Sequence, residues 1–484
     1  MVRLSRSEIS RIYQEGEASV IALVESFQDA LASLEMRFAA LEEQQKKNSK
    51  NSSKPPSSDG LRRTVSLREP TGKKPGGQAG HEGHTLKRTA HPNEVVRHAA
   101  PEVCPKCQHS IGESAETLAE RRQVFDVPKV AIRVTEHQVY ARRCSCCGSN
   151  AKASFPDDVR APVQYGSRLG SLAVYLTAYH LVPLDRTVEI LKELCGASLC
   201  KATVDAMLLR AYHTTEASEQ AIVEALVVSP AVFADETGVR VDSRTDWIHV
   251  IATERLTHYH PSIHRGRQGH EETGILQRFA ERGGILHTDF FASYRGYACV
   301  HAYCNAHLLR ELGFLADVGK HAWAGQARTL LQETLHYLKT ERTATQNSAL
   351  TLPVAMLTDV HNRFDALVEA ALLVHPRSTE RAEGKTRGRI KQTEERLLLE
   401  RLRDFKADIL RFAGNPLAAF DNNLAERDLR MIKVQQKISG SFRSVGGAKV
   451  FCRLRGFCST VGKQSANILD ALLDAKAGIP FSFT

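Results

Sequence analysis

The first regular pattern along the chain is a repeat of apolar residues near its start. The repeat alternates in steps of four and three residues, at Val20, Val24, Phe27, Leu31, Leu34, Phe38 and Leu41. Such spacing is typical of the a and d positions of a coiled coil, and three heptads predict dimerisation through residues 1–45. The alternative is an amphipathic helix packed on the body of the same chain, because a lone helix of this length is marginally stable.

Polar, glycine-rich and basic sequence follows this repeat. Between Lys46 and Arg88 there are eleven Lys or Arg residues and three acidic residues, in a stretch too poor in apolar side chains to repay ordering. We therefore expect a flexible basic linker over residues 46–95, with Lys73 and Lys74 as candidate nucleic-acid contacts. A solvated tail is the alternative interpretation.

Two Cys-x-x-Cys pairs are the most specific short signal in the chain. Cys104 and Cys107 form one pair, Cys144 and Cys147 form the other, and 36 residues separate the pairs. Four thiolates in two chelating pairs suit a closed tetrahedral zinc site, which leaves no open position for a catalytic water. We therefore expect a structural Zn²⁺, with a redox pair as the lesser alternative.

The sequence between the two pairs is rich in β-branched residues over 130–140, which predicts an extended strand. Paired knuckles joined by a strand indicate a zinc ribbon over residues 96–152. Cys146 is a spare thiol that could replace a neighbour. The total of eleven cysteines is odd and scattered over a long chain, which favours metal binding and free thiols over a disulfide framework.

Helical periodicity then recurs in three segments, residues 167–180, 184–194 and 201–212. Gly196 suits the turn between the second and third segments, and Ser198 suits the next N-cap. This arrangement resembles a helix-turn-helix and predicts a helical, DNA-binding-like domain over residues 160–228. A plain helical bundle explains the pattern equally well.

From residue 231 the period changes to that of strands. Strand-like runs cover residues 231–235, 238–241, 247–252 and 256–263; a helix is expected over 271–282, strands over 285–289 and 297–303, and a helix from 305. Three antiparallel strands, a helix, a strand, then strand and helix form the order of an RNase H-like fold. Asp235 lies on the first strand and Asp289 ends the fourth, and these strands are neighbours in that fold.

A third acidic residue, Glu426, sits one turn into a helix for which Asp421 is the expected N-cap. A mostly helical insertion over residues 319–415 would separate it from Asp289. Carboxylates held on three different elements suit a pair of divalent ions about 3.5–4 Å apart, which is the arrangement used for phosphoryl transfer. We therefore expect Asp235, Asp289 and Glu426 to bind two Mg²⁺ or Mn²⁺ ions.

Basic residues follow Glu426 on the same helix. Arg427, Arg430 and Lys433 are candidate DNA contacts near these metals, although an internal ion pair with Asp428 or Glu426 is as plausible. The basic segment 385–391 could bind phosphate or form a solvated loop.

Other polar residues in this region are more simply structural. Glu236 follows Asp235 on a strand and should face the opposite side of the sheet. Cys304 and His307 offer two metal ligands, which do not make a site, and helix packing is favoured. His249 and His287 lie in strands and suit the core better than a catalytic role.

Taken together, these motifs resemble bacterial insertion-sequence transposases of the DDE class, specifically the insertion sequence 66 type. The resemblance covers the N-terminal apolar repeat, the cysteine pairs, Ser52–Asp59, Gly76–His84, Asp235-Glu-Thr, Asp289-x4-Tyr294, Cys304-Asn-Ala-His307 and Asp421-Asn-Asn-x2-Glu-Arg-x2-Arg430. It implies magnesium-dependent cleavage at the ends of the element and joining of the free 3′-hydroxyls to a target. Asp235, Asp289 and Glu426 would be its three acids.

The sequence thus predicts a multidomain α+β protein whose RNase H-like catalytic domain spans 229–318 and 416–484, interrupted by the helical insertion. The net charge of +10 suits double-stranded DNA as a partner. This DNA would include both the ends of the element and the target. We expect a homodimer or higher oligomer, and accessory proteins of the same element are candidate partners. No export signal or membrane span is recognisable, so a cytoplasmic location is expected.

Two other functions fit the same sequence. One is a catalytically inactive zinc-ribbon DNA-binding regulator derived from a transposase, and the other is a nuclease that does not join strands. The presence of all three acids favours the active enzyme.

Overall fold

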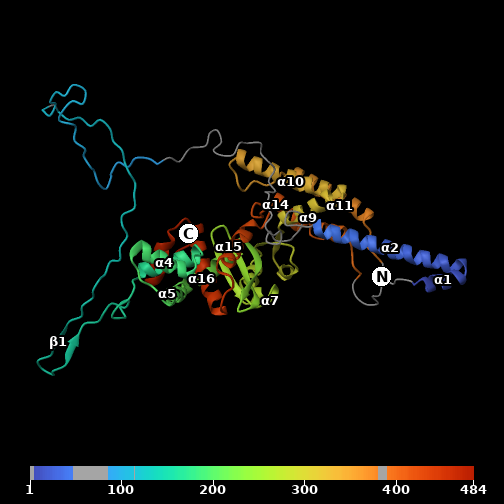
Figure 1. Cartoon of the computed structure of the whole chain (residues 1–484), viewed down its shortest axis with the longest axis horizontal. Helices are drawn as coiled ribbons and strands as arrows, with labels where there is room; N and C mark the ends of the chain where they lie inside the picture. Colours follow the sequence, from blue (N-terminus) through green and yellow to red (C-terminus); the bar gives the residue numbers. More distant parts are fainter. Residues whose placement is uncertain (1–4, 47–85, 114, 380–389, 484) are drawn as a thin grey trace.

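The computed structural model describes residues 5–46, 86–113, 115–379 and 390–483 (Figure 1). The candidate contacts Lys73 and Lys74 lie outside these residues, as does most of the basic segment 385–391. Within the described ranges, no helix is both long enough and apolar enough to cross a bilayer.

The N-terminal segment forms two helices, α1 (Arg6–Gln14) and α2 (Glu17–Lys46). A capping box starts α1: the backbone N–H of Glu8 donates to Ser5 Oγ, and the backbone N–H of Ser5 donates to the Glu8 carboxylate. The apolar a/d residues of α2 form a seam; six of the seven are solvent-exposed, from Val24 at 48% to Phe38 at 65% exposure, and Val20 is half-buried. The alternative in which this seam packs on the body of the same chain is therefore wrong.

The cysteine-rich region contains one short antiparallel ladder, in which β1 (Ala141–Arg143) pairs with β2 (Asn150–Lys152). The strand predicted over residues 130–140 is wrong, since this segment forms no ladder. Its β-branched side chains are exposed, Val134 among them. Strand propensity reflects packing on a neighbouring strand, and none of the described residues forms such a strand beside this segment.

The helical region comprises α3 (Ser167–Val174), a π-helical turn η2 (Tyr175–Tyr179), α4 (Leu184–Cys195), α5 (Lys201–Thr214) and α6 (Glu216–Val227). Gly196 ends α4 in the left-handed region, with φ of 74°, as its turn role required. The predicted N-cap at Ser198 is wrong, because α5 begins after Cys200. The carbonyl oxygen of Ser198 instead accepts a hydrogen bond from the Tyr165 hydroxyl.

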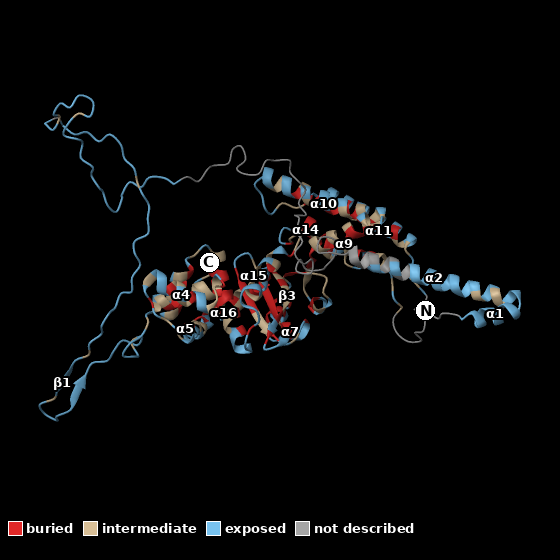
Figure 2. Cartoon of the chain, in the orientation of Figure 1, coloured by how far each residue is buried: buried red, intermediate tan, exposed pale blue. Residues whose placement is uncertain are grey.

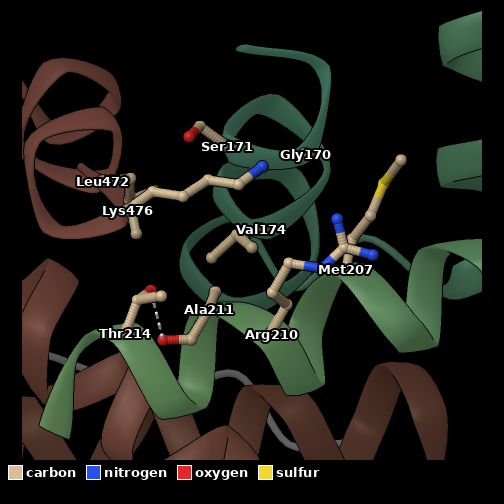
Figure 3. Close-up of a pocket in the computed structure, with 9 residues that line it drawn as sticks. All are labelled: Gly170, Ser171, Val174, Met207, Arg210, Ala211, Thr214, Leu472 and Lys476. Carbon is tan, nitrogen blue, oxygen red and sulfur yellow. Dashed lines mark hydrogen bonds between the residues drawn. The ribbon is translucent and has the colours of Figure 1, made fainter. Parts of the chain in front are cut away.

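This helical region shares its core with the last two helices, α16 (Val445–Lys463) and α17 (Ile468–Lys476). Val174 and Leu472 belong to one apolar cluster. Figure 3 shows a small hollow where α3, α5 and α17 meet, lined by Arg210 and Lys476 among others. The C-terminal helices thus join the helical region to the sheet that follows.

The central sheet has the strand order β5-β4-β3-β6-β7. Its strands are β3 (Ala231–Val241), β4 (Arg244–Ala252), β5 (Thr257–Ser262), β6 (Ile285–Thr288) and β7 (Val300–Tyr303). The first three are antiparallel, whereas β6 runs parallel to both β3 and β7. The two runs expected at 231–235 and 238–241 form the single strand β3, which turns into β4 through Asp242 and Ser243, both at positive φ.

Helices cover both faces of this sheet (Figure 2). On one face, Val232 and Ala234 pack against α6 and α8 (Ile275–Ala280). On the other, Val239 and Ile248 pack against α15 (Asn423–Ser439) and α16. Of the helix predicted over 271–282, the structure forms α8; the short helix α7 (Arg267–Glu271) precedes it, and Gly274, with a positive φ of 63°, lies between the two. A 3₁₀ turn, η3 (Ala292–Gly296), follows β6.

Between β7 and α15 lies a helical unit with its own core, which includes Leu331, Phe364 and Leu399. Its helices are α9 (Asn305–Asp317), α10 (Ala322–Ala344), α11 (Val354–Val374), α12 (Glu394–Asp404), α13 (Lys406–Ile409) and α14 (Arg411–Gly414). Helical structure was expected in this part of the chain. Because α15 returns to the sheet, the acid on α15 can approach those on β3 and β6.

Candidate active site

The register of the two central parallel strands brings Asp235 and Asp289 to the same place. Strand β3 pairs with β6 so that Phe233 lies opposite His287, and their rings stack with centroids 4.2 Å apart. Asp235 and Asp289 each lie two residues further along. Since side chains alternate along a strand, both carboxylates leave the sheet on the face of that ring pair. The predicted convergence of these two acids therefore follows from the register.

Local hydrogen bonds orient both aspartates. The backbone N–H of Glu236 donates to Asp235 Oδ1 at 2.8 Å, and that of Phe291 donates to Asp289 Oδ1 at 2.9 Å. Each carboxylate keeps its other oxygen for a ligand. Asp235, Asp289 and Glu426 are all partly buried rather than fully enclosed, so a substrate or an ion can reach them.

The helix α15 brings the third acid to this site, but it begins one residue later than expected. Its N-cap is Asn422 and not Asp421, although Asp421 Oδ1 accepts a hydrogen bond from the backbone N–H of Asn423. Asn422 is buried, and its Nδ2 donates to the carbonyl oxygen of Ala234 at 2.9 Å. Its side chain makes no capping hydrogen bond, and the bond from its Nδ2 to Ala234 ties the start of α15 to strand β3, one helical turn before Glu426.

Burial and mutual repulsion disfavour the charged forms of these acids. Burial, followed by the charges of Asp289 and Glu236, raises the pKa of Asp235 well above its ordinary value. Burial also raises the pKa of Asp289 and of Glu426. Carboxylates gathered in this way are stabilised by a cation, and a hard divalent ion with oxygen ligands fits the donor set.

Two residues left outside the site by sequence reasoning lie against Glu426. Cys304 Sγ is 3.9 Å and His307 Nδ1 is 3.6 Å from Glu426 Oε1, and the ligand atoms of the three residues lie within 4.8 Å of one another. Burial lowers the pKa of His307 to about 4 and raises that of Cys304 to about 12. Both side chains are thus neutral near pH 7. The Cys-x-x-His spacing at the start of α9 was the available signal, but the third member is remote in sequence.

The basic residues of α15 differ in their surroundings. Lys433 Nζ donates to the carbonyl oxygen of Gly238 at 2.6 Å, and burial lowers its pKa. As whole residues, Arg427, Arg430 and Lys433 are all exposed, and Lys433 differs in the bond of its amino group to strand β3. Asp428 instead forms an ion pair with Lys463 at 2.7 Å, so the alternative of an internal ion pair between these basic residues and Asp428 is wrong. The charge of Arg430 does act on Glu426, since it lowers the pKa of that carboxyl against the effect of burial.

The histidine of β6 is a core residue, as predicted. The backbone N–H of Ala419 donates to His287 Nε2 at 2.8 Å, and His287 Nδ1 lies 3.3 Å from the Val232 carbonyl oxygen. Burial lowers the pKa of His287 to about 4. With both nitrogens engaged and the ring neutral, this side chain has no capacity to act as a base.

Glu236 faces the other side of the sheet, as predicted. It accepts hydrogen bonds from the Tyr294 hydroxyl at 2.6 Å and from Arg265 Nε at 3.2 Å. Tyr294 belongs to the core that contains Val232 and Ala234, on the face away from α15. Glu236 is not isolated there, because His249 and His270 lie beside it.

The two cysteine pairs form turns of the same kind. In the first, the backbone N–H of Cys104 donates to His109 and that of Gln108 donates back to Cys104; in the second, Cys144, Ser149 and Gly148 repeat the pattern. Gln108 and Gly148 both have positive φ, at 59° and 69°. Each turn brings its own two thiols together, as the side-chain contacts of Cys104 with Cys107 and of Cys144 with Cys147 show.

The structure does not bring the two pairs together. Among the described residues, no group of three or more closely spaced ligand atoms includes these thiols. A hydrogen bond from Ser149 is the main cause that lowers the pKa of Cys147, to about 7. A partly ionised thiol in a preformed turn is a suitable zinc donor.

Comparison with known families accounts for most of the chain. The model of the Transposase IS66 family matches residues 162–450, which is more than half of the sequence. The chain belongs to this family. The zinc-finger binding domain of transposase IS66 matches residues 101–148, which contain both cysteine pairs. A family of unknown function (DUF6444) matches residues 5–87, and a search of curated proteins finds no match.

Membership of the IS66 family makes the chain a transposase, with DNA as its partner and Zn²⁺ as the expected ion of the zinc-finger domain. The match over residues 162–450 includes Asp235, Asp289 and Glu426. A DDE transposase also implies a divalent metal, and the three partly buried carboxylates fit such an ion by their chemistry.

Proposed function

We propose that the chain catalyses metal-dependent cleavage at the ends of its insertion sequence and joins those ends to target DNA. Asp235, Asp289 and Glu426 would hold two divalent ions, Mg²⁺ or Mn²⁺. One observation carries this proposal. The register of β3 with β6 and the return of α15 to the sheet bring three carboxyl groups together, and the pKa of each is raised. The strand order supports an RNase H-like catalytic domain over 229–318 and 416–484, interrupted by residues 319–415.

The residues of the site would divide the work. Asp235 and Asp289, fixed on a rigid sheet, would set the position of the ions, and Glu426 would close the site from the helix. Divalent ions in such a site activate an attacking oxygen and stabilise the leaving oxygen of an in-line displacement at phosphorus. The exposed Arg427 and Arg430 would hold DNA phosphates beside it, because guanidinium groups bind phosphate oxygens in pairs.

Binding of DNA would also involve regions away from the sheet. The zinc ribbon over 96–152, the basic linker with Lys73 and Lys74, and the helical region over 160–228 would contact the element ends. Dimerisation through the exposed seam of α2 would bring two ends into one complex. Lys433 contributes less to phosphate binding in this scheme, since its amino group is already held by Gly238.

The test is a cleavage and joining assay on a DNA fragment that bears the element's own ends. Asp235→Asn, Asp289→Asn and Glu426→Gln each remove one ligand charge with little change of shape, so both reactions should fall by orders of magnitude. Band-shift binding should survive in all three variants. Glu254→Gln is the matched control, because Glu254 is exposed in the turn after β4.

The same assay separates the alternatives. Wild-type protein that binds the ends but neither cleaves nor joins them under any divalent metal would indicate a regulator derived from a transposase. Cleavage without joining would indicate a nuclease. Near-normal activity of Glu426→Gln would show that the third ligand lies elsewhere.

A further inference from the structure

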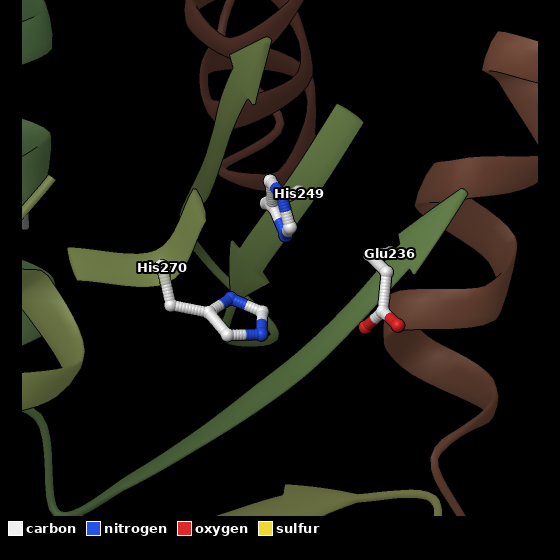
Figure 4. Close-up of side chains that lie close together, drawn as sticks. All are labelled: Glu236, His249 and His270. Carbon is white, nitrogen blue, oxygen red and sulfur yellow. The ribbon is translucent and has the colours of Figure 1, made fainter. Parts of the chain in front are cut away.

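A second group of metal-type ligands lies behind the proposed active site, on the opposite face of strand β3. Its members are Glu236 on β3, His249 on β4 and His270 on α7 (Figure 4). The ligand atoms of the three side chains lie within 4.8 Å of one another. Glu236 and His249 are direct partners in the antiparallel register, so the pairing of β3 with β4 sets their proximity.

All three side chains are buried. His249 and His270 are 3% and 2% exposed, and the Glu236 side chain is 3% exposed. His249 Nδ1 and His270 Nε2 have no hydrogen-bond partner among the described residues. Buried polar atoms without partners are costly, and an ion that accepts their lone pairs would remove that cost.

The outer contacts of these side chains match those of metal ligands. His249 Nε2 lies 3.0 Å from the carbonyl oxygen of His264, which suits a donated hydrogen bond and leaves the lone pair on the orphaned Nδ1. Gly269 permits this contact, since a Cβ there would lie 2.3 Å from His249 Nε2. Glu236 is oriented in turn by Tyr294 and Arg265. Burial lowers the pKa of His249 to about 4 and that of His270 to about 3, so both rings are neutral near pH 7.

We propose that Glu236, His249 and His270 form a binding site for a divalent transition-metal ion of the zinc type, distinct from the Asp235 site and from the cysteine pairs. Two imidazole nitrogens and one carboxylate oxygen suit Zn²⁺, whereas Mg²⁺ prefers oxygen ligands alone. The ion would tie β3, β4 and α7 together directly behind Asp235. This binding site does not depend on the proposed catalytic function.

Arg265 would control access to the ion. Its guanidinium lies over the rings of Trp247 and Phe291, at 4.6 and 4.3 Å from their centroids, and half of its side chain is exposed. Its Nε also donates a hydrogen bond to Glu236 Oε1 at 3.2 Å. The nearby Glu272 is already engaged, because it accepts hydrogen bonds from His260 and Ser262, both at 2.7 Å. Glu272 is therefore not counted as a ligand.

The experiment measures zinc bound by the full-length protein in excess Mg²⁺, which keeps the all-oxygen site occupied. We expect about two zinc ions per chain, one with sulfur neighbours from the cysteine pairs and one with nitrogen and oxygen neighbours. X-ray absorption at the zinc edge distinguishes these environments. Wild-type protein whose zinc has sulfur neighbours only, or that holds no zinc, would overturn the proposal.

Variants assign the nitrogen-coordinated ion. His249→Gln and His270→Gln should each lose it while retaining the sulfur-coordinated ion. His260→Gln is the matched control, since His260 lies directly opposite His249 on β5, and this variant should keep both ions.

His307→Gln tests the other cluster, beside Glu426. Retention of nitrogen-coordinated zinc by both His249→Gln and His270→Gln, or its loss only in His307→Gln, would contradict the assignment. Circular dichroism checks folding, and if a variant unfolds the wild-type spectrum still decides.

Discussion

The side-chain amide of Asn422 donates a hydrogen bond of 2.9 Å to the carbonyl oxygen of Ala234. Ala234 directly precedes Asp235, and Asn422 lies one helical turn before Glu426. A single bond between buried groups thus ties the helix of the third acid to the strand of the first. In addition, the backbone N–H of Asn422 contacts Cys304 Sγ at 3.2 Å, which joins the start of α9 to the same point.

Loss of this bond should therefore reduce activity without removing a metal ligand. Asn422→Ala leaves the buried carbonyl of Ala234 unpaired, at a cost of about 1–3 kcal/mol in the free energy of unfolding. Glu426 should then be held less firmly, so cleavage should fall while DNA binding is retained. Thermal unfolding and the cleavage assay measure the two effects. Asn423→Ala is the control because Asn423 is exposed, and equal damage from both changes would contradict this role of Asn422.

The active-site acids should destabilise the protein when no metal is bound. Burial and repulsion raise the pKa of Asp235 in the folded state. A group whose folded pKa is raised contributes stability that is complete at low pH and is lost as pH rises from its ordinary pKa, near 3.8, through the folded value. At neutral pH without divalent ions, Asp235→Asn should therefore have a higher Tm than the wild type.

Addition of Mg²⁺ should reverse that order. An ion that binds only the folded state raises the Tm of the wild type, whereas the variant lacks a ligand and should respond weakly. Calorimetry at pH 7 with chelator and then with Mg²⁺ gives both comparisons. A wild type that is more stable than Asp235→Asn in chelator would show that the carboxylate is already compensated within the protein.

Zinc binding and folding of the cysteine-rich region should be one event. Cys107→Ser removes one of four thiolates, so the sulfur-coordinated zinc should be released while the sheet remains folded. Cys146→Ser is the matched control, because this spare thiol lies in the same turn as Cys144 and Cys147. Metal analysis of protein purified without chelators measures the outcome. Absence of sulfur-coordinated zinc from the wild type, or its loss in both variants, would disprove the assignment of the four ligands.

The exposed seam of α2 should hold two chains together. Leu31→Asp with Leu34→Asp places charges at a and d positions, where they cannot be hydrated unless the helices separate. Sedimentation of the full-length protein should then change from dimer, or higher oligomer, to monomer. Ala32→Asp with Ser33→Asp places the same charges off the seam, at exposed positions. A monomeric wild type would argue against the coiled coil.

Local signals in the sequence were sufficient for several parts of this protein. The helix over the N-terminal seam, the meander from Ala231, and the neighbouring strands that carry Asp235 and Asp289 followed from apolar periodicity and turn residues. The offset of 54 residues between the paired strands equals the sequence separation of the two acids. Periodicity and spacing are properties of short segments, so they can be recognised before the fold is known.

Tertiary structure alone decided the remaining contacts. Asn422 bonds to a strand nearly two hundred residues earlier, and Cys304 meets Glu426 only because α15 returns to the sheet. Likewise, Glu236 and Asp235 face opposite sides of the sheet because side chains alternate along a strand. The proximity of Glu236 to His270, however, depends on how α7 packs over β4. Partners brought together by chain reversal leave no periodic signal in the sequence, since their separation along the chain is set by intervening loops and not by helix or strand geometry.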